Sequence, residues 1–171
     1  MKPIYVKTID SPVGKLLLAA SDRGLCVIEF ASGKQTYAKF LAGVEASPEH
    51  PVLCKAEKQL AEYFAGKRTA FDVPLDMQGT VFQIKAWREL QKIPYGKTIS
   101  YGQQAKGMGD ANKARAVGMA NGRNPISIIV PCHRVIGANG TLTGFGGGLN
   151  VKQKLLALEQ AVATRDQKTA A

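Results

Sequence analysis

Apolar and polar residues alternate over the first 30 positions of this 171-residue chain, and this pattern constrains the fold more than any other feature. The alternation runs in three short segments, which are separated at Gly14 and Gly24, where turns are expected. We therefore predict three antiparallel strands. Helical spacing follows over residues 48–66 and ends at a glycine, and alternation returns over residues 71–75, which predicts one further strand.

Beyond residue 76 the apolar residues recur at the three- and four-residue spacing of helices. Thr80 is suited to cap one helix, and Ser100 begins a second, short helix that ends at the sequence GMG. Asp110 then begins a third helix with the sequence ANKARAVGMANG. Two short helices joined by a glycine-containing turn are typical of a helix-turn-helix. The C-terminal part is therefore expected to be mostly helical and to contain this motif.

These patterns together predict an α+β protein. A small N-terminal sheet-and-helix domain is expected over residues 1–76, and a mostly helical C-terminal domain over residues 77–163. The polar tail over residues 164–171 is expected to be disordered. A chain of 171 residues is long enough for each of two such domains to bury a core.

The composition narrows the classes of function. A net charge of +10 favours a polyanionic partner, nucleic acid or an anionic membrane, although a basic surface that only keeps the protein in solution gives the same charge. No stretch approaches the roughly 20 apolar residues that span a bilayer, and the N-terminus lacks the apolar core of a signal peptide. The 3 cysteines provide no disulfide framework. We therefore expect a cytoplasmic protein that does not bind a membrane.

The third predicted helix is thin, because every second residue from Ala114 to Gly122 is alanine or glycine. Such a helix can pack closely on a neighbouring helix. It can also enter a narrow groove such as the minor groove of B-DNA, which is about 6 Å wide. Packing is the safer interpretation, but the basic charge and Arg115, which is expected to be exposed, bring the two alternatives close together.

The sequence VPCHRV places Cys132, His133 and Arg134 side by side after the apolar run ISII, which is expected to be a buried strand. A zinc site would need about four ligands, and the other cysteines and histidine are scattered singly, so no metal is predicted. A redox pair would need a second cysteine nearby, and the sequence has none there. A cysteine packed in the core is also a poor fit, because two basic residues follow Cys132. A nucleophile fits better, since an adjacent imidazole or cation lowers the pKa of a thiol from about 8.5.

Two further features follow Cys132. The run VIGANGTLTGFGGGLN is rich in glycine, so its backbone could approach a flat ligand, or it could be a mobile surface loop. Glu159 is the only carboxylate between Asp110 and Asp166, and it is therefore the candidate to orient His133, although a lone carboxylate on a helix is usually a surface residue.

The motifs SYGQQA, ARAVG, NPISIIVPCHRVIG and TGFGGG, in this order, resemble those of the O6-alkylguanine-DNA alkyltransferases, also called methylated-DNA–protein-cysteine methyltransferases. The resemblance covers about residues 80 to 160. The first 75 residues resemble only in general character the family's variable N-terminal domain, which is a sheet-and-helix (ribonuclease H-like) domain. The resemblance implies a repair protein that flips a damaged base and takes the alkyl group of O6-alkylguanine onto its own cysteine, once and irreversibly.

The resemblance also implies roles for residues of the chemical site. Cys132 would accept the alkyl group, His133 would act through a water as its base, and Glu159 would orient His133. The base pocket would include Val135 and the glycine-rich run, here represented by Phe145, Gly146 and Gly147. Many family members have tyrosine in place of Phe145. The resemblance implies that the tyrosine hydroxyl assists the leaving guanine, so its absence here would affect protonation of the guanine.

On the DNA-binding side, Arg115 would enter the duplex in place of the flipped base, and Tyr101 would crowd the phosphate on its 3′ side. Asn124 would tie the recognition helix to the active-site segment, and Ala116 and Gly118 would face the minor groove. No cofactor is expected, and the partner would be double-stranded DNA bound by a monomer. Two alternatives are a relative that binds alkylated DNA without reacting, which would lack Cys132, and a transcription regulator, which would carry base-reading polar side chains on the helix.

Overall fold

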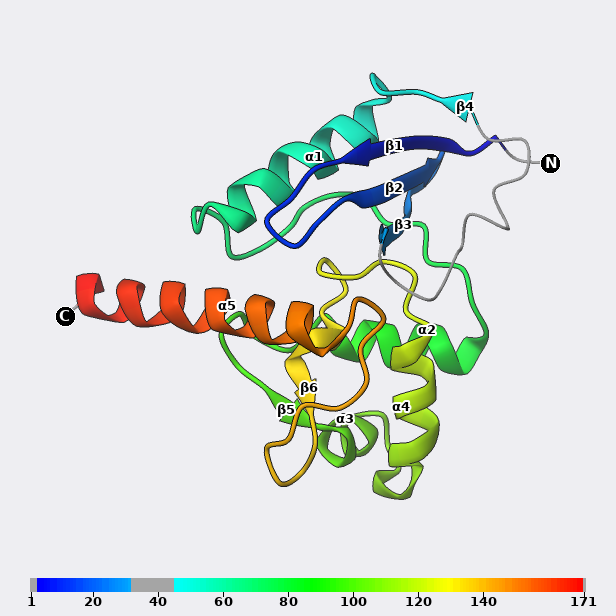
Figure 1. Cartoon of the computed structure of the whole chain (residues 1–171). Helices are drawn as coiled ribbons and strands as arrows, with labels where there is room; N and C mark the ends of the chain where they lie inside the picture. Colours follow the sequence, from blue (N-terminus) through cyan, green and yellow to red (C-terminus); the bar gives the residue numbers. More distant parts are fainter. Residues whose placement is uncertain (1–2, 32–44, 171) are drawn as a thin grey trace. The chain divides into compact units, whose positions relative to one another are not determined.

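The computed structural model describes residues 3–31 and 45–170 (Figure 1). The chain divides into two compact units. The first comprises Met1–Gln78 together with Pro125–Ser127, and the second comprises Gly79–Asn124 together with Ile128–Ala171. The structure is α+β, as predicted: a sheet with one helix comes first and helices predominate afterwards.

The first unit is built on a four-stranded sheet in the order β3-β2-β1-β4. The strands are β1 (Tyr5–Ile9), β2 (Leu16–Ser21), β3 (Gly24–Phe30) and β4 (Glu45–Ala46). β1, β2 and β3 form antiparallel pairs, which confirms the three predicted strands, whereas β4 pairs in parallel with β1. The alternation therefore reflects a sheet with one face on a core.

Helix α1 (Pro51–Phe64) lies along this sheet (Figure 1). Its buried apolar residues recur at helical spacing and share the face that packs on the strands; they are Leu53, Ala56, Leu60 and Tyr63. The predicted glycine stop is confirmed, since Gly66 adopts a φ of +73°, a conformation that favours glycine.

The predicted strand over residues 71–75 is wrong. Only one bridge forms there, between Leu25 and Leu75. The Leu25 N–H donates to Pro74 O at 2.8 Å, and the Asp76 N–H donates to Leu25 O at 2.8 Å. Pro74 has no N–H to give to a ladder, so the segment touches the edge of β3 at one point and continues as a loop.

Pro125–Ser127 contacts the same strand, β3. The Ile28 N–H donates to Pro125 O at 2.9 Å, and a single parallel bridge joins Ile28 to Ile126. The rest of this apolar run is not the buried strand that we expected. Ile128 adopts a φ of 74°, which is strained for a β-branched residue and is not a strand conformation.

The second unit contains the three predicted helices. α2 (Val81–Leu90) and α3 (Tyr101–Gly107) each begin with a capping box, formed by Thr80 with Gln83 and by Ser100 with Gln103. Asp110 caps a 3₁₀ turn (Ala111–Lys113), and α4 (Ala114–Gly122) follows it directly. α3 and α4 contact each other and α2.

Two more elements complete this unit. β5 (Ile99–Ser100) and β6 (Val135–Ile136) form a short parallel pair, and a 3₁₀ turn (Cys132–Arg134) precedes β6. The last helix, α5 (Leu149–Ala170), extends through the tail that we expected to be disordered (Figure 1). Alanine, glutamine, lysine and arginine in this tail are good helix formers, so the helix continues although its last turns are exposed. Ala171 lies outside the described residues.

Helix α4 is held by its neighbours on one side. The Trp87 indole N–H donates to Ala120 O at 2.8 Å, and the side-chain amides of Gln104 and Asn121 bond each other reciprocally at 3.0 and 2.7 Å. Close packing is therefore one reason for small residues. The opposite face is exposed, and it carries Arg115, Ala116, Met119 and Gly122. Packing thus does not account for the small residues Ala116 and Gly122 of α4.

Candidate active site

Cys132 begins the 3₁₀ turn that follows Pro131, and it is only 8% exposed. Its N–H donates to Val130 O at 2.9 Å, and the Asn124 side-chain amide donates to the same carbonyl at 2.7 Å. Burial raises the pKa of the Cys132 thiol, while Asn124 and the positive charge of Lys152 act in the opposite direction. The thiol is therefore protonated at rest and needs a base to become nucleophilic.

His133 and Glu159 form the pair predicted beside it. Nε2 of His133 lies 2.6 Å from Oε2 of Glu159, and both side chains are buried. Burial raises the pKa of Glu159, but hydrogen bonds and charge from His133 and Arg134 outweigh this and bring it to about 2. An ionised carboxylate only accepts hydrogen bonds, so Nε2 carries the hydrogen and Nδ1 is the basic nitrogen. Among the described residues, the buried Nδ1 atom has no hydrogen-bond partner.

Arg134 joins this pair, which the sequence reasoning did not foresee. Its Nε donates to Oε1 of Glu159 at 2.7 Å, and its Nη2 donates to Oε2 at 3.1 Å. A third hydrogen bond runs from Nη1 to Ile93 O at 2.8 Å, and the guanidinium lies 5.5 Å from the centre of the Tyr95 ring. The carboxylate is thus held between an imidazole and a bidentate guanidinium.

Lys152 is the second residue that the sequence reasoning missed. Its buried ammonium donates to Val135 O at 2.7 Å and to Thr143 O at 2.9 Å. The signal for it lies in α5, where Lys152 and Glu159 share one buried face with Leu155 and Val162. Charged residues placed at apolar positions of a helix indicate buried polar partners.

The glycine-rich run lies beside this cluster as a loop with several turns. The Gly148 N–H donates to Phe145 O at 2.9 Å, and the Tyr101 hydroxyl bonds Thr143 Oγ1 at 2.7 Å. Phe145 and Gly147 are half-buried, whereas Gly146 is exposed, and a Cβ added to Gly146 would meet nothing within 4 Å. Open space beside this backbone is compatible with a flat ligand.

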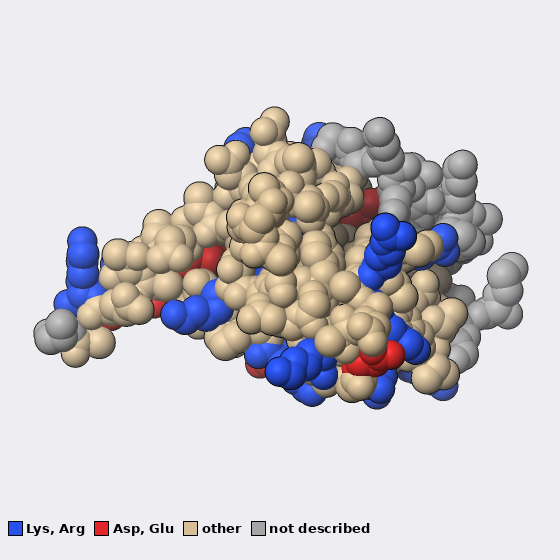
Figure 2. Space-filling view, turned by 90° about the horizontal axis from the view of Figure 1, so that it is seen from below, with Lys and Arg blue, Asp and Glu red and all other residues tan. Residues whose placement is uncertain are grey.

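The predicted DNA-binding residues lie on or next to α4. Arg115 and Ala116 are exposed, and a Cβ on Gly118 would meet the Tyr101 ring at 3.7 Å. Asn124, just after α4, is buried, and its bond to Val130 O links the end of this helix to the segment before Cys132. Figure 2 looks toward the side of the second unit that carries α3 and α4, where basic side chains predominate over acidic ones. The exposed basic residues of this part are Lys106, Lys113, Arg115 and Arg123.

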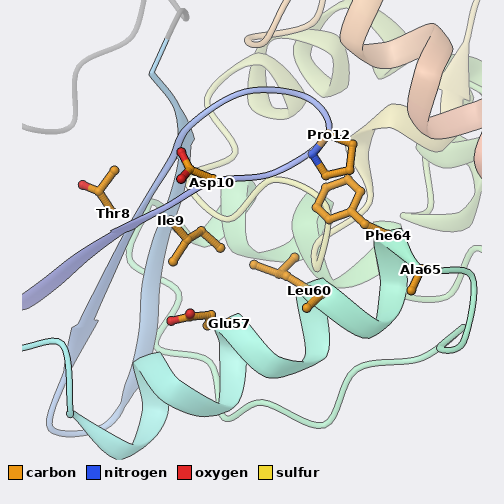
Figure 3. Close-up of a pocket in the computed structure, with 9 residues that line it drawn as sticks. Thr8, Ile9, Asp10, Pro12, Glu57, Leu60, Phe64 and Ala65 are labelled. Atoms are coloured by element: carbon orange, nitrogen blue, oxygen red, sulfur yellow. The ribbon is translucent and has the colours of Figure 1, made fainter.

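A separate hollow of about 680 Å³ lies in the first unit, between β1, the turn after it and α1 (Figure 3). Its lining is mostly apolar with two carboxylates, Asp10 and Glu57, and it contains neither a cysteine nor a histidine. It therefore does not provide the nucleophile and base that Cys132 and His133 bring together. Within residues 3–31 and 45–170, no three cysteine, histidine or acidic side chains are grouped so that they could hold a metal ion, and no helix could cross a membrane.

Two family models match the chain. Residues 4–77 match the ribonuclease-like domain of 6-O-methylguanine DNA methyltransferase, and residues 81–161 match its DNA-binding domain. The protein belongs to the 6-O-methylguanine DNA methyltransferase family. This confirms the resemblance seen in the motifs around Cys132, and it extends the match to the N-terminal unit.

Curated relatives and solved structures agree with this assignment. The methylated-DNA–protein-cysteine methyltransferase of Mycolicibacterium paratuberculosis is 52% identical over 92% of this chain and 93% of its own. That of Methanosarcina acetivorans is 47% identical over 91% and 98%. A crystal structure of Mycobacterium tuberculosis OGT in complex with DNA aligns with a TM-score of 0.86, at 47% identity, over 92% of this chain and 94% of that one.

Proposed function

We propose that this protein repairs DNA by transferring the alkyl group of O6-alkylguanine to its own Cys132. Close relatives carry the name of this activity over almost the whole chain. Cys132 is the only cysteine of the second unit, since the other two lie in the first. The observation that carries the assignment is the buried 2.6 Å hydrogen bond between Glu159 and His133, the residue that follows Cys132 in the chain.

The reaction needs a base and no cofactor. His133 Nδ1 takes the thiol proton of Cys132, through a water molecule, and Glu159 holds the imidazole in the tautomer that can do so. The thiolate then attacks the alkyl carbon: a carbon–sulfur bond forms, the carbon–oxygen bond breaks, and guanine leaves with the electron pair and takes up a proton. The thioether is not reversed or hydrolysed, so each molecule acts once.

The damaged base reaches Cys132 by leaving the duplex. α4 lies in the minor groove with Ala116 and Gly118 against it, because a bulkier helix would not fit the narrow groove. Arg115 fills the place of the flipped nucleotide, and Tyr101 presses on the phosphate on its 3′ side. The crystal structure of a relative, Mycobacterium tuberculosis OGT, in complex with DNA supports DNA binding.

The extruded base is held beside the glycine-rich loop. Val135 O, which already accepts a hydrogen bond from Lys152, has a second lone pair for the guanine amino group. Phe145 and the backbone of Gly146 and Gly147 form the wall of the pocket. Because Phe145 carries no hydroxyl, protonation of the leaving guanine falls to another donor. Whether O4-alkylthymine also reacts depends on the size of this pocket.

The C-terminal domain, over residues 77–163, carries both DNA binding and alkyl transfer, and the protein acts on DNA as a monomer. Its place in the cell is the cytoplasm, in keeping with three cysteines that are all free among the described residues.

The test is to mix the protein with a duplex that contains O6-methylguanine and to measure its intact mass. We expect one added methyl group per molecule, located at Cys132, and no further reaction with fresh substrate. Cys132→Ser should add no mass, whereas the matched variant Cys54→Ser, which removes an exposed thiol of the first unit, should react as the original protein does. Methyl transfer by Cys132→Ser would disprove the assignment.

A further inference from the structure

We propose that Arg134 is a positioning residue of this reaction: by clamping Glu159 it keeps His133 neutral, with Nδ1 free to act as the base. This inference rests on the proposed function, since it concerns the base of that reaction. It assigns a task to a residue that does not itself touch the nucleophile.

The carboxylate of Glu159 is shared mainly between two side chains. It receives one hydrogen bond from His133 Nε2 at 2.6 Å and two from Arg134, at 2.7 and 3.1 Å, and a longer one from the Gly96 N–H at 3.4 Å. Arg134 is itself fixed by Ile93 O at 2.8 Å and by the ring of Tyr95. All three charged or polar side chains are at most 7% exposed, so water hardly screens their charges.

The negative charge of Glu159 is balanced by Arg134 while His133 is neutral. Glu159 carries one negative charge and Arg134 one positive charge, because arginine stays protonated in proteins. Lys152 from α5 adds a further positive charge that acts on His133, whereas Cys132 and Tyr95 are uncharged at rest. A proton on His133 would therefore add a positive charge that Glu159 does not balance.

The directions of the pKa shifts agree with this balance. Burial lowers the pKa of His133, Glu159 raises it, and the positive charges of Arg134 and Lys152 lower it. Without Arg134, the carboxylate would be balanced by His133 alone. The imidazolium would then be stabilised, and it could not accept the proton of Cys132.

The first experiment measures the rate of Cys132 alkylation by free O6-benzylguanine between about pH 5 and pH 9. This small substrate needs no DNA binding. Arg134→Met removes the charge and keeps the apolar stem, and we expect the acid limb of its pH profile to move up by about one pH unit. Arg134→Lys keeps the charge, so its limb should stay in place even if its rate falls. An equal loss for Arg134→Met at every pH would show a purely structural role and overturn the proposal.

The double variant Arg134→Met/Glu159→Gln is the matched control for this shift. Removing the carboxylate as well removes the reason for His133 to hold a proton, so the acid limb should move back down. A limb that stays at the raised pH in the double variant would contradict the proposal.

The second experiment uses the original protein, so its result does not depend on whether a variant folds. The chain has 2 histidines, so a nitrogen-15 spectrum of the original protein contains the Nδ1 and Nε2 signals of two imidazole rings, and His50 of the first unit serves as the reference. We expect His133 to be neutral at pH 7, with hydrogen on Nε2 only. A protonated Nδ1 at this pH would refute the proposal. The spectrum can be read whether or not Cys132 is alkylated, so a failure of the proposed function would be seen separately.

Discussion

Glu159 is the residue on which the electrostatics of the candidate site depend. It accepts hydrogen bonds from an imidazole and a guanidinium, and its pKa falls from 4.5 to about 2. Neither partner adjoins it in sequence, because Glu159 lies on α5 and both partners lie 25 or 26 positions earlier. A lone glutamate on a helix is usually exposed, so its place as the only carboxylate between Asp110 and Asp166 made it a candidate, and the match to family motifs indicated its role.

This shift makes the stability of the protein depend on pH. A carboxyl whose pKa is lower in the folded state stabilises the fold above its unfolded pKa, and that contribution is lost as the pH falls through the folded value. For Glu159 this contribution is lost between about pH 4.5 and about pH 2, and the loss lowers the free energy of unfolding by about 3 kcal/mol. The lowered pKa of His133 acts in the same direction below about pH 6.5, because the unfolded chain takes up that proton first.

Urea unfolding at a series of pH values measures this dependence. We expect the free energy of unfolding to fall on acidification, and Glu159→Gln to be less stable than the original protein near neutral pH but to lose less between about pH 4.5 and pH 2. Asp10→Asn, which alters an exposed ion pair with Lys15, is a suitable control and should follow the original curve. Parallel curves for all three proteins would mean that Glu159 is not ionised by its neighbours.

At the scale of the elements, α4 has two different faces. One face bonds to α2 and α3 through Trp87, Gln104 and Asn121, and the other exposes small residues and Arg115. The first face sets the position of the helix within its unit. The proposed function places the second face in the minor groove. A larger side chain on this face should therefore weaken DNA binding.

Ala116→Leu tests that consequence, because it adds bulk to the exposed face without touching the packed one. We expect duplex binding to weaken by roughly tenfold or more, since about 1–3 kcal/mol is the usual cost of overfilling a close contact. Reaction with free O6-benzylguanine should be unchanged. Ala157→Leu, which places the same side chain on an exposed position of α5, should bind DNA normally. Equal effects of the two variants would argue against a groove-facing α4.

The same elements show what could be predicted from the sequence. α2 and α3 were predictable because their capping residues, Thr80 and Ser100, act within one turn of the chain. The prediction of a strand over residues 71–75 was wrong because Pro74 has no N–H to donate to a neighbouring strand, although apolar and polar residues alternate there. Arg134 and Lys152 were missed because their partners, Glu159 in one case and Val135 and Thr143 in the other, are set by how α5 packs, and no local pattern encodes that.

At the scale of the whole molecule, the reaction ends by changing a buried part of the fold. Cys132 is 8% exposed, and Val130, Asn124 and the His133 pair surround its turn. A methyl group on its sulfur adds volume where little is free, at a cost of about 1–3 kcal/mol. Proteins of this size have a free energy of unfolding of only about 5–15 kcal/mol, so the methylated protein is expected to be measurably less stable.

Thermal unfolding of the two forms measures this loss. We expect the methylated protein, separated from DNA, to melt about 2–10 °C lower than the unreacted protein. Cys132→Ser exposed to the same damaged duplex should keep its own melting temperature. If the methylated and unreacted proteins melt together, Cys132 has more space around its sulfur than its burial suggests.

The path of the chain through β3 bears on how the protein is made. Ile28 bonds to Pro125, and these two residues leave the ribosome 97 positions apart. The first unit therefore emerges almost whole, with residues 74–76 already able to pair with Leu25, yet the partner of Ile28 on β3 is missing until α2, α3 and α4 have also been synthesised. The nucleophile follows only a few residues later. During translation, the last gap in the N-terminal sheet closes and the reactive cysteine appears at nearly the same moment.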